Sequence, residues 1–176
     1  MISIDDVIQT WLGAIESDRA FFDVALDSAF AGSRLGSVLD YYSENVTTDD
    51  YSLLMISEGG QSGKWVGMPE QADITFSLSI TGAVFHDDPQ VCAKLIRTLA
   101  AQTWETFNNR HAAGLLVSGD QYLFHGDDGA NPPLPLRSID FGEARLSGAT
   151  VRAFVGQYEG KVRYGAQDFR PPEVLD

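Results

Sequence analysis

Two of the three histidines in this chain stand just before carboxylates. His86 begins the phrase His-Asp-Asp, and His125 begins the phrase His-Gly-Asp-Asp. An imidazole beside carboxylates can bind a metal ion or exchange protons with a substrate. The same aspartates also suit structural roles, because the first pair can start a helix and the second can form a turn. We therefore expect no metal ion or cofactor here, and a ligand pocket near His86 and His125 stands as an alternative.

The other reactive side chains form no catalytic pattern. Cys92, the single cysteine, is expected inside a helix among apolar neighbours, where a thiol is inert. Residues 58–64 read Glu-Gly-Gly-Gln-Ser-Gly-Lys, which is similar to part of a phosphate-binding loop, but Trp65 stands where that loop needs Ser or Thr. We expect a flexible loop at 58–64. The sequence predicts that the protein is not an enzyme.

The composition fits one globular domain. Of the 176 residues, 44% are hydrophobic and 21% are charged, as in an ordinary chain with a real core. The lone cysteine, and acids where a signal peptide has bases, favour a cytoplasmic protein. No apolar run reaches the ~20 residues of a membrane span, so no membrane partner is expected. We expect a single domain over residues 1–176, with an extended C-terminal tail from about residue 165.

Acidic and basic residues are unevenly distributed. The net charge is −13, residues 1–60 hold eleven acidic against two basic residues, and residues 137–170 hold six basic against four acidic ones. So acidic a chain argues against a grip on nucleic-acid phosphates, which needs clustered Lys and Arg. The asymmetry fits either a solvated surface or an acidic face that meets the basic face of a neighbouring copy. The second arrangement is a heterologous contact, the kind that builds rings.

Two helices are predicted. The first spans residues 3–17, where Ser3 and Asp6 can form a short capping box and apolar residues recur every three or four positions. The second runs from Pro89 to about residue 108, because Asp88 can cap it and Pro89 suits its first position. Residues 21–26 fit a strand as well as a continuing helix.

The remaining apolar segments predict strands. Residues 73–84 alternate apolar with hydroxyl-bearing side chains, as in a half-buried antiparallel strand whose hydroxyl face would suit cover by a neighbouring subunit. Further strands are predicted at 50–56, 115–125 (one or two), 137–146 with 150–158 (a hairpin) and 162–164. The fold class is therefore predicted as α+β: an antiparallel or mixed β-sheet with one long helix packed on a face and an N-terminal helix.

This order of elements resembles the tail terminator, or tail-completion, proteins of long-tailed bacteriophages. The matching parts are the opening helix, the 73–84 strand that leads through Asp88 and Pro89 into the 89–108 helix, and the closing 137–158 hairpin. The resemblance implies a structural virion protein, a homohexamer ring that joins the tail tube protein to the head connector or stopper protein. It implies assembly in the host cytoplasm and then a place in the virion tail. DNA would pass through the ring without specific binding, because a lumen of carboxylates repels phosphate.

Two sets of charged residues are candidates for the contacts of such a ring. Asp49, Asp50 and Glu58 are expected near the lumen or at a ring contact. Arg145 and Arg152 are expected at the opposing, basic subunit contact. Two other functions stay open: a small-ligand-binding or enzymatic domain with the histidine pocket described above, and an acidic inhibitor or immunity-type protein that masks a basic partner.

Overall fold

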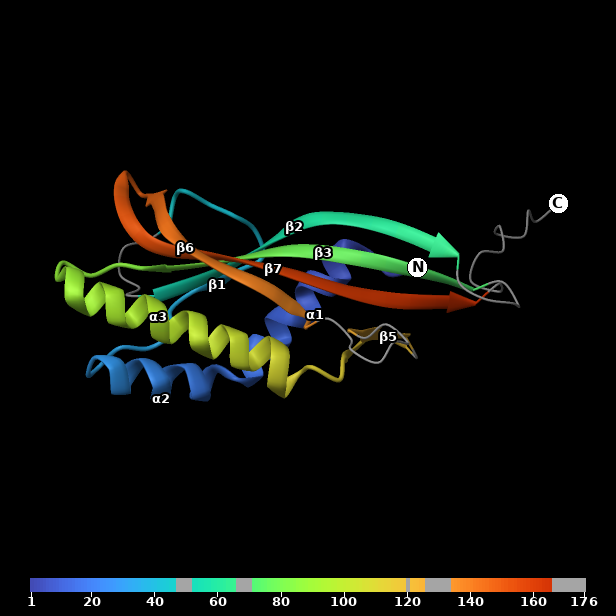
Figure 1. Cartoon of the computed structure of the whole chain (residues 1–176), viewed down its shortest axis with the longest axis horizontal. Coiled ribbons are helices and arrows are strands. Elements are labelled where there is room, and N and C mark those ends of the chain that lie inside the picture. The colour runs from blue at the N-terminus through green and yellow to red at the C-terminus, as the bar shows by residue number, and fades with distance from the viewer. Residues whose placement is uncertain (47–51, 66–70, 120, 126–133, 166–176) are drawn as a thin grey trace.

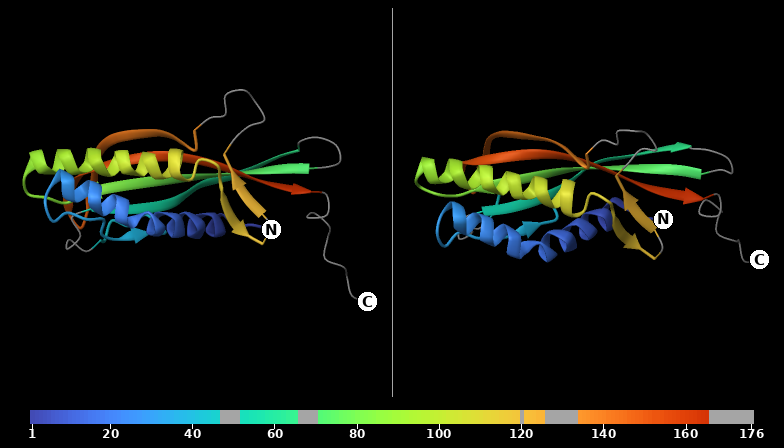
Figure 2. Two further views of the ribbon diagram at one scale, coloured as in Figure 1. Left: turned by 90° about the horizontal axis from the view of Figure 1, so that it is seen from below. Right: turned by 60° about the horizontal axis from the view of Figure 1, so that its bottom comes forward.

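The computed structural model describes residues 1–46, 52–65, 71–119, 121–125 and 134–165 (Figure 1). Within these residues, helices gather on one face of a mixed sheet, so the predicted α+β fold is confirmed (Figure 2). The strand order is β1-β2-β3-β7-β5-β4, and β6 also pairs with β7. β1 runs parallel to β2, and the other pairs are antiparallel.

The helices begin where local capping signals predicted. In α1 (Ile4–Ser17), the Ser3 hydroxyl accepts a hydrogen bond from Asp6 N at 3.2 Å, and the Asp6 carboxylate accepts one from Ser3 N at 2.7 Å. In α3 (Pro89–Glu105), Asp88 Oδ1 accepts a hydrogen bond from Gln90 N at 2.8 Å. A π-helical turn (Thr106–Arg110) extends α3. The ambiguous residues 21–26 are helical, within α2 (Arg19–Ala29).

The first long strand corrects one prediction. β1 (Val38–Leu39) is short, but β2 runs from Ser52 to Trp65 and includes residues 58–64, so the expected flexible loop there is wrong. Those residues pair with β3 (Gln71–Val84). The glycine-rich sequence predicted a loop because the strand that pairs with it cannot be recognised from residues 58–64 alone. A bulge at Gly59 interrupts the register, and a Cβ at that position would lie 3.0 Å from the Ser77 carbonyl oxygen.

The remaining strands follow the predicted order. β4 (Leu115–Ser118) and β5 (Gln121–Phe124) are the two short strands expected at 115–125. β6 (Leu136–Leu146) and β7 (Ala149–Gly165) form the expected hairpin. Positive φ angles at Ser147 (50°) and Gly148 (78°) give its turn the twist that suits a two-residue hairpin. The separate strand predicted at 162–164 is wrong, because β7 continues unbroken to Gly165.

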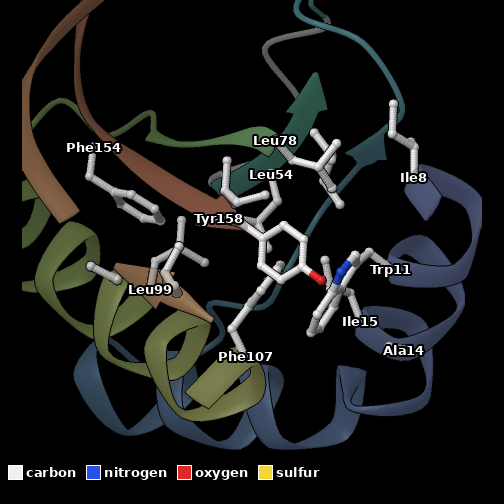
Figure 3. Close-up of a cluster of buried hydrophobic side chains, with 14 of the residues drawn as sticks. Ile8, Trp11, Ala14, Ile15, Leu54, Leu78, Leu99, Phe107, Phe154 and Tyr158 are labelled. Carbon is white, nitrogen blue, oxygen red and sulfur yellow. The ribbon is translucent and has the colours of Figure 1, made fainter. Parts of the chain in front are cut away.

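The main core lies between the helices and the sheet. Its centre is aromatic: Trp11 of α1 stacks on Phe107 at 3.9 Å between ring centroids, and Tyr158 of β7 meets Trp11 edge-on at 5.0 Å (Figure 3). A smaller apolar cluster, which includes Leu53 and Ala153, lies on the other face of the sheet. Each apolar side chain removed from water in such clusters contributes about 1.5–3 kcal/mol before entropy is counted.

Candidate assembly interface

The structure places His86 and His125 far apart. His86 lies in the turn between β3 and α3, where its Nδ1 accepts a hydrogen bond from Asp88 N at 3.0 Å. His125 follows β5 and packs against Trp11, with 5.9 Å between ring centroids. Trp11 stacks on Phe107, which lies just past the C-terminal end of α3. The two histidines therefore sit at opposite ends of α3, whose 17 residues span about 25 Å.

His125 belongs to a buried hydrogen-bonded group. Its Nε2 accepts a hydrogen bond from the Tyr158 hydroxyl at 2.7 Å, and its Nδ1 donates one to the Ala112 carbonyl oxygen at 3.1 Å. Burial lowers the pKa of His125 and raises the pKa of Tyr158, so both side chains are held neutral. Tyr158 is only 2% exposed. The two side chains are therefore buried away from any substrate in the solvent. Their hydrogen bonds connect β7 to the segments that precede and follow the β4–β5 hairpin.

A second polar cluster joins the α1–α2 corner to the end of α3. Asp18 Oδ2 lies 3.4 Å from His111 Nε2 and 3.8 Å from Arg110 Nε. The Arg110 guanidinium also stacks over the Phe21 ring at 3.3 Å from its centroid. Among the residues that the structure describes, no group of three or more His, Cys, Asp and Glu side chains could hold a metal ion. The cluster is best explained as a bridge between helices.

Two long strand edges lie on opposite sides of the sheet. β3 covers one side of β2, and β1 pairs with its other side only at Leu54 and Met55. β7 covers one side of β6. Within the described part of the chain, no strand pairs with the outer side of β2 from Ser57 to Trp65 or with the outer side of β6. The N–H and C=O groups of such an edge form a template for another strand.

The face of the sheet away from the helices is rich in hydroxyl groups, as the alternation in β3 predicted. Its residues in β3 include Thr75, Ser77, Ser79 and Thr81, on the same side as the small apolar cluster. Two ion pairs lie on this face. Arg163 donates two hydrogen bonds to Asp73, at 2.7 and 3.0 Å, and Arg137 donates one to Glu159 at 2.8 Å. Asp140, opposite Val155, and Lys161, opposite Thr75, add further charges to the same face.

Of the three acidic candidates, Asp49 and Asp50 lie outside the described residues. Glu58 is exposed on the free part of β2, opposite Leu78 of β3. Leu78 belongs to the main core, so Glu58 lies on the side of the sheet that the helices cover. The carboxylate is therefore at the margin of the sheet, beside an unpaired backbone edge.

The two basic candidates are exposed on the β6–β7 hairpin. Arg152 of β7 lies opposite Val84 of β3, a residue of the main core, and Arg145 of β6 lies opposite Thr150, two positions from Arg152. Because side chains two apart in a strand share a face, both arginines lie on the helix side, as Glu58 does. Arg145 is on the edge strand itself, and Arg152 is one strand further in.

The exposure of Phe141 was missed by sequence reasoning. This residue of β6 is 58% exposed, although its ring also meets Phe154 edge-on at 6.4 Å. The sequence did contain an indication of this exposure. Ile139, Phe141 and Glu143 alternate along the strand and so share one side of it, and that side includes a charged residue as well as apolar ones. Such a strand is not fully covered by its own chain.

No protein-family model and no curated protein sequence matches this chain. None of the described helices is both long enough and apolar enough to cross a membrane.

Proposed function

We propose that this chain is a structural virion protein that joins copies of itself head to tail into a ring, and that it serves as a tail terminator between the tail tube and the head connector. The observation that carries the proposal is that no other strand in the described ranges pairs with the outer side of β6 or of β2 from Ser57 to Trp65. When two copies join through two different surfaces, the pair still has one free surface of each kind. Further copies can therefore add, and the chain of copies closes into a ring when the rotation between neighbours allows it.

Strand direction favours this contact. β2 is antiparallel to β3, β3 to β7, and β7 to β6, so β6 runs opposite to β2. If neighbouring copies keep their helices on the same side, β6 of one copy meets β2 of the next as an antiparallel pair. That pairing satisfies the free backbone groups with the slightly more stable ladder pattern.

The charges at the two margins agree with the same contact. Glu58 on β2 and Arg145 on β6 lie on the same side of the sheet, at its opposite edges. Glu58 is level with Leu136 of β6 in the register of the sheet, whereas Arg145 lies opposite Thr150, eight β7 positions from Tyr158. The two charges face each other across a join when neighbouring copies are staggered along the strands by that amount, and their attraction then favours this register over other pairings. At an exposed site such a pair contributes up to about 1 kcal/mol, so it selects the register while the backbone ladder provides most of the stability.

The terminator role rests on the order of elements and on the chemistry of the chain. A net charge of −13 suits a channel through which DNA slides without sticking. The sealed His125–Tyr158 pair gives no support to the competing enzymatic function. Because many functions share one fold, the state of assembly is the property that distinguishes this role from the others.

The test is the mass of the purified protein by light scattering over a concentration series, with the same sample imaged by negative stain. We expect a closed ring of about six copies. Glu58→Arg or Arg145→Glu should shift the equilibrium toward smaller species, and the double variant should restore the ring. Asp87→Arg, a matched change at an exposed carboxylate in the β3–α3 turn, should have no effect. A monomer at every concentration would contradict self-assembly and favour a ligand-binding domain.

A further inference from the structure

A pocket of about 290 Å³ lies between α3 and the β6–β7 hairpin. Ala93 and Ile96 of α3 and the exposed ring of Phe141 give it apolar walls. Arg97 of α3 and Arg152 of β7 line it as well. The pocket therefore combines an apolar interior with two positive charges.

Neither arginine has an acidic partner within the described part of the chain. Arg97 Nε donates to the Ala93 carbonyl oxygen at 2.9 Å, inside its own helix. Arg152 lies opposite Glu143 in the strand ladder, but the two side chains form no ion pair. In a protein with 25 acidic and 12 basic residues, two such guanidiniums around one apolar pocket indicate a ligand that is both acidic and apolar.

The sequence of this chain contains such a ligand. Residues 173–176 read Glu-Val-Leu-Asp, two apolar side chains between two carboxylates. We propose that the Arg97–Arg152 pocket binds residues 173–176 of a second copy. Val174 or Leu175 fills the apolar interior, and Glu173 and Asp176 pair with the two guanidiniums.

The length of the C-terminal segment indicates that the tail in the pocket comes from a second copy. Arg152 lies 13 residues before Gly165 on the same strand, which is about 43 Å at the rise of a β-strand. From Gly165 to Val174 there are nine residues, which extend to at most about 32 Å. The tail would also have to turn back along β7. It therefore falls short of its own pocket, whereas the pocket of a neighbouring copy carries no such restriction.

This contact is again heterologous, with the tail of one copy in the pocket of the next. This inference rests on the proposed function. It adds a second contact between neighbouring copies of the ring, besides the contact between the strand edges. It also assigns Arg152 a partner different from that of Arg145. The strand-edge contact uses Arg145 on β6, and the tail contact uses Arg152 with Arg97 on α3.

The test uses a fluorescein-labelled peptide of residues 166–176 and the full-length chain with Glu173→Lys and Asp176→Lys, so that the protein's own tail does not compete. Fluorescence anisotropy should show saturable binding that weakens with added salt. Arg97→Glu or Arg152→Glu in this receptor should weaken binding at least tenfold. Arg34→Glu, an equal charge change at an exposed arginine outside the pocket, should leave it unchanged. A peptide with lysines at 173 and 176 should bind a chain that carries both arginine reversals and keeps Glu173 and Asp176, because the tail of that chain no longer matches the reversed pocket.

Absence of saturable binding, or an equal loss in the Arg34→Glu control, would overturn the pocket assignment. Light scattering on the unaltered chain separates this result from the proposed function. Rings that form although the peptide does not bind would remove the tail contact and leave the ring. Peptide binding to a chain that forms dimers or open chains but no closed ring would keep the tail contact and remove the ring, whereas a chain that stays monomeric at every concentration would overturn both.

Discussion

The Tyr158 hydroxyl donates a 2.7 Å hydrogen bond to Nε2 of His125, and both side chains are buried. Tyr158 comes from the middle of β7 and also meets the Trp11 ring (Figure 3). His125 follows β5. Because the Nδ1–H of His125 is used by Ala112 O, its Nε2 is left as an acceptor, and among the described residues Tyr158 is its donor. The bond thus connects the central strand to the margin of the fold.

Removing the Tyr158 hydroxyl should destabilise the protein. Tyr158→Phe keeps the ring packing but leaves His125 Nε2 buried without a donor, which costs about 1–3 kcal/mol. Urea unfolding followed by tryptophan fluorescence measures the change. Tyr122→Phe is the control, because Tyr122 is 51% exposed and its free energy of unfolding should change by less than about 0.5 kcal/mol. Equal stability of the two variants would show that the buried bond contributes nothing.

Stability should fall as the pH drops below the ordinary histidine pKa. Burial lowers the pKa of His125 below its usual value of 6.5, and hydrogen bonds to the backbone of Ala112 and His111 offset only part of this effect. The unfolded chain then binds this proton at a higher pH than the folded chain does. The free energy of unfolding therefore has its full value above about pH 6.5 and decreases as the pH falls through that value.

Urea unfolding between about pH 5 and 8 measures this dependence. His125→Gln should flatten the slope in this window, since glutamine does not titrate. His86→Gln, at the other end of α3, should retain the slope of the unaltered chain. A slope that is the same with and without His125 would assign the pH dependence to other groups.

Two glycines should respond oppositely to alanine. A Cβ at Gly82 of β3 would lie 2.2 Å from a ring carbon of Phe154, so Gly82→Ala should destabilise the protein by about 1–3 kcal/mol. Gly13 is exposed in the middle of α1 with no atom within 4 Å of the same position. Gly13→Ala should stabilise it by up to about 1 kcal/mol through helix propensity. Thermal unfolding distinguishes the two directions, and a neutral Gly82→Ala would mean that Phe154 moves freely.

Asn108 should anchor the start of β6. Its side chain donates to the Leu136 carbonyl oxygen at 3.0 Å and accepts from Leu136 N at 2.8 Å, in a buried setting. Asn108→Ala leaves both backbone groups unpaired, which costs about 1–3 kcal/mol for each buried group. Faster hydrogen exchange at the Leu136 amide, with lower stability to urea, is the expected result. Asn109→Ala, at the exposed neighbouring position, should alter neither measurement.

Features set by neighbouring residues could be predicted from the sequence. The capping box of Ser3 and Asp6, the start of α3 at Asp88 and Pro89, and the alternation of residues 73–84 each depend on a few consecutive positions. A hydrogen bond from a side chain to the next turn, or the period of a strand, acts within that range. The α+β class follows from their order.

Other features needed the packing of distant segments. Residues 21–26 became helical because Phe22 and Leu26, four positions apart, are both fully buried while α2 packs on α3. Residues 58–64 became a strand because β3 pairs with them, in spite of their glycines. Neither partner is visible in the local sequence.

The candidate sites divide in the same way. Composition and residue type indicated an acidic chain with a basic hairpin, and they identified Glu58, Arg145 and Arg152 as charges to examine. The structure separated His86 from His125 by the length of α3, and it brought Arg97 and Arg152, 55 positions apart, to one pocket. The physical reason is range: propensity and periodicity act over one turn or one strand, whereas an unpaired edge or a pocket exists only after remote segments have packed.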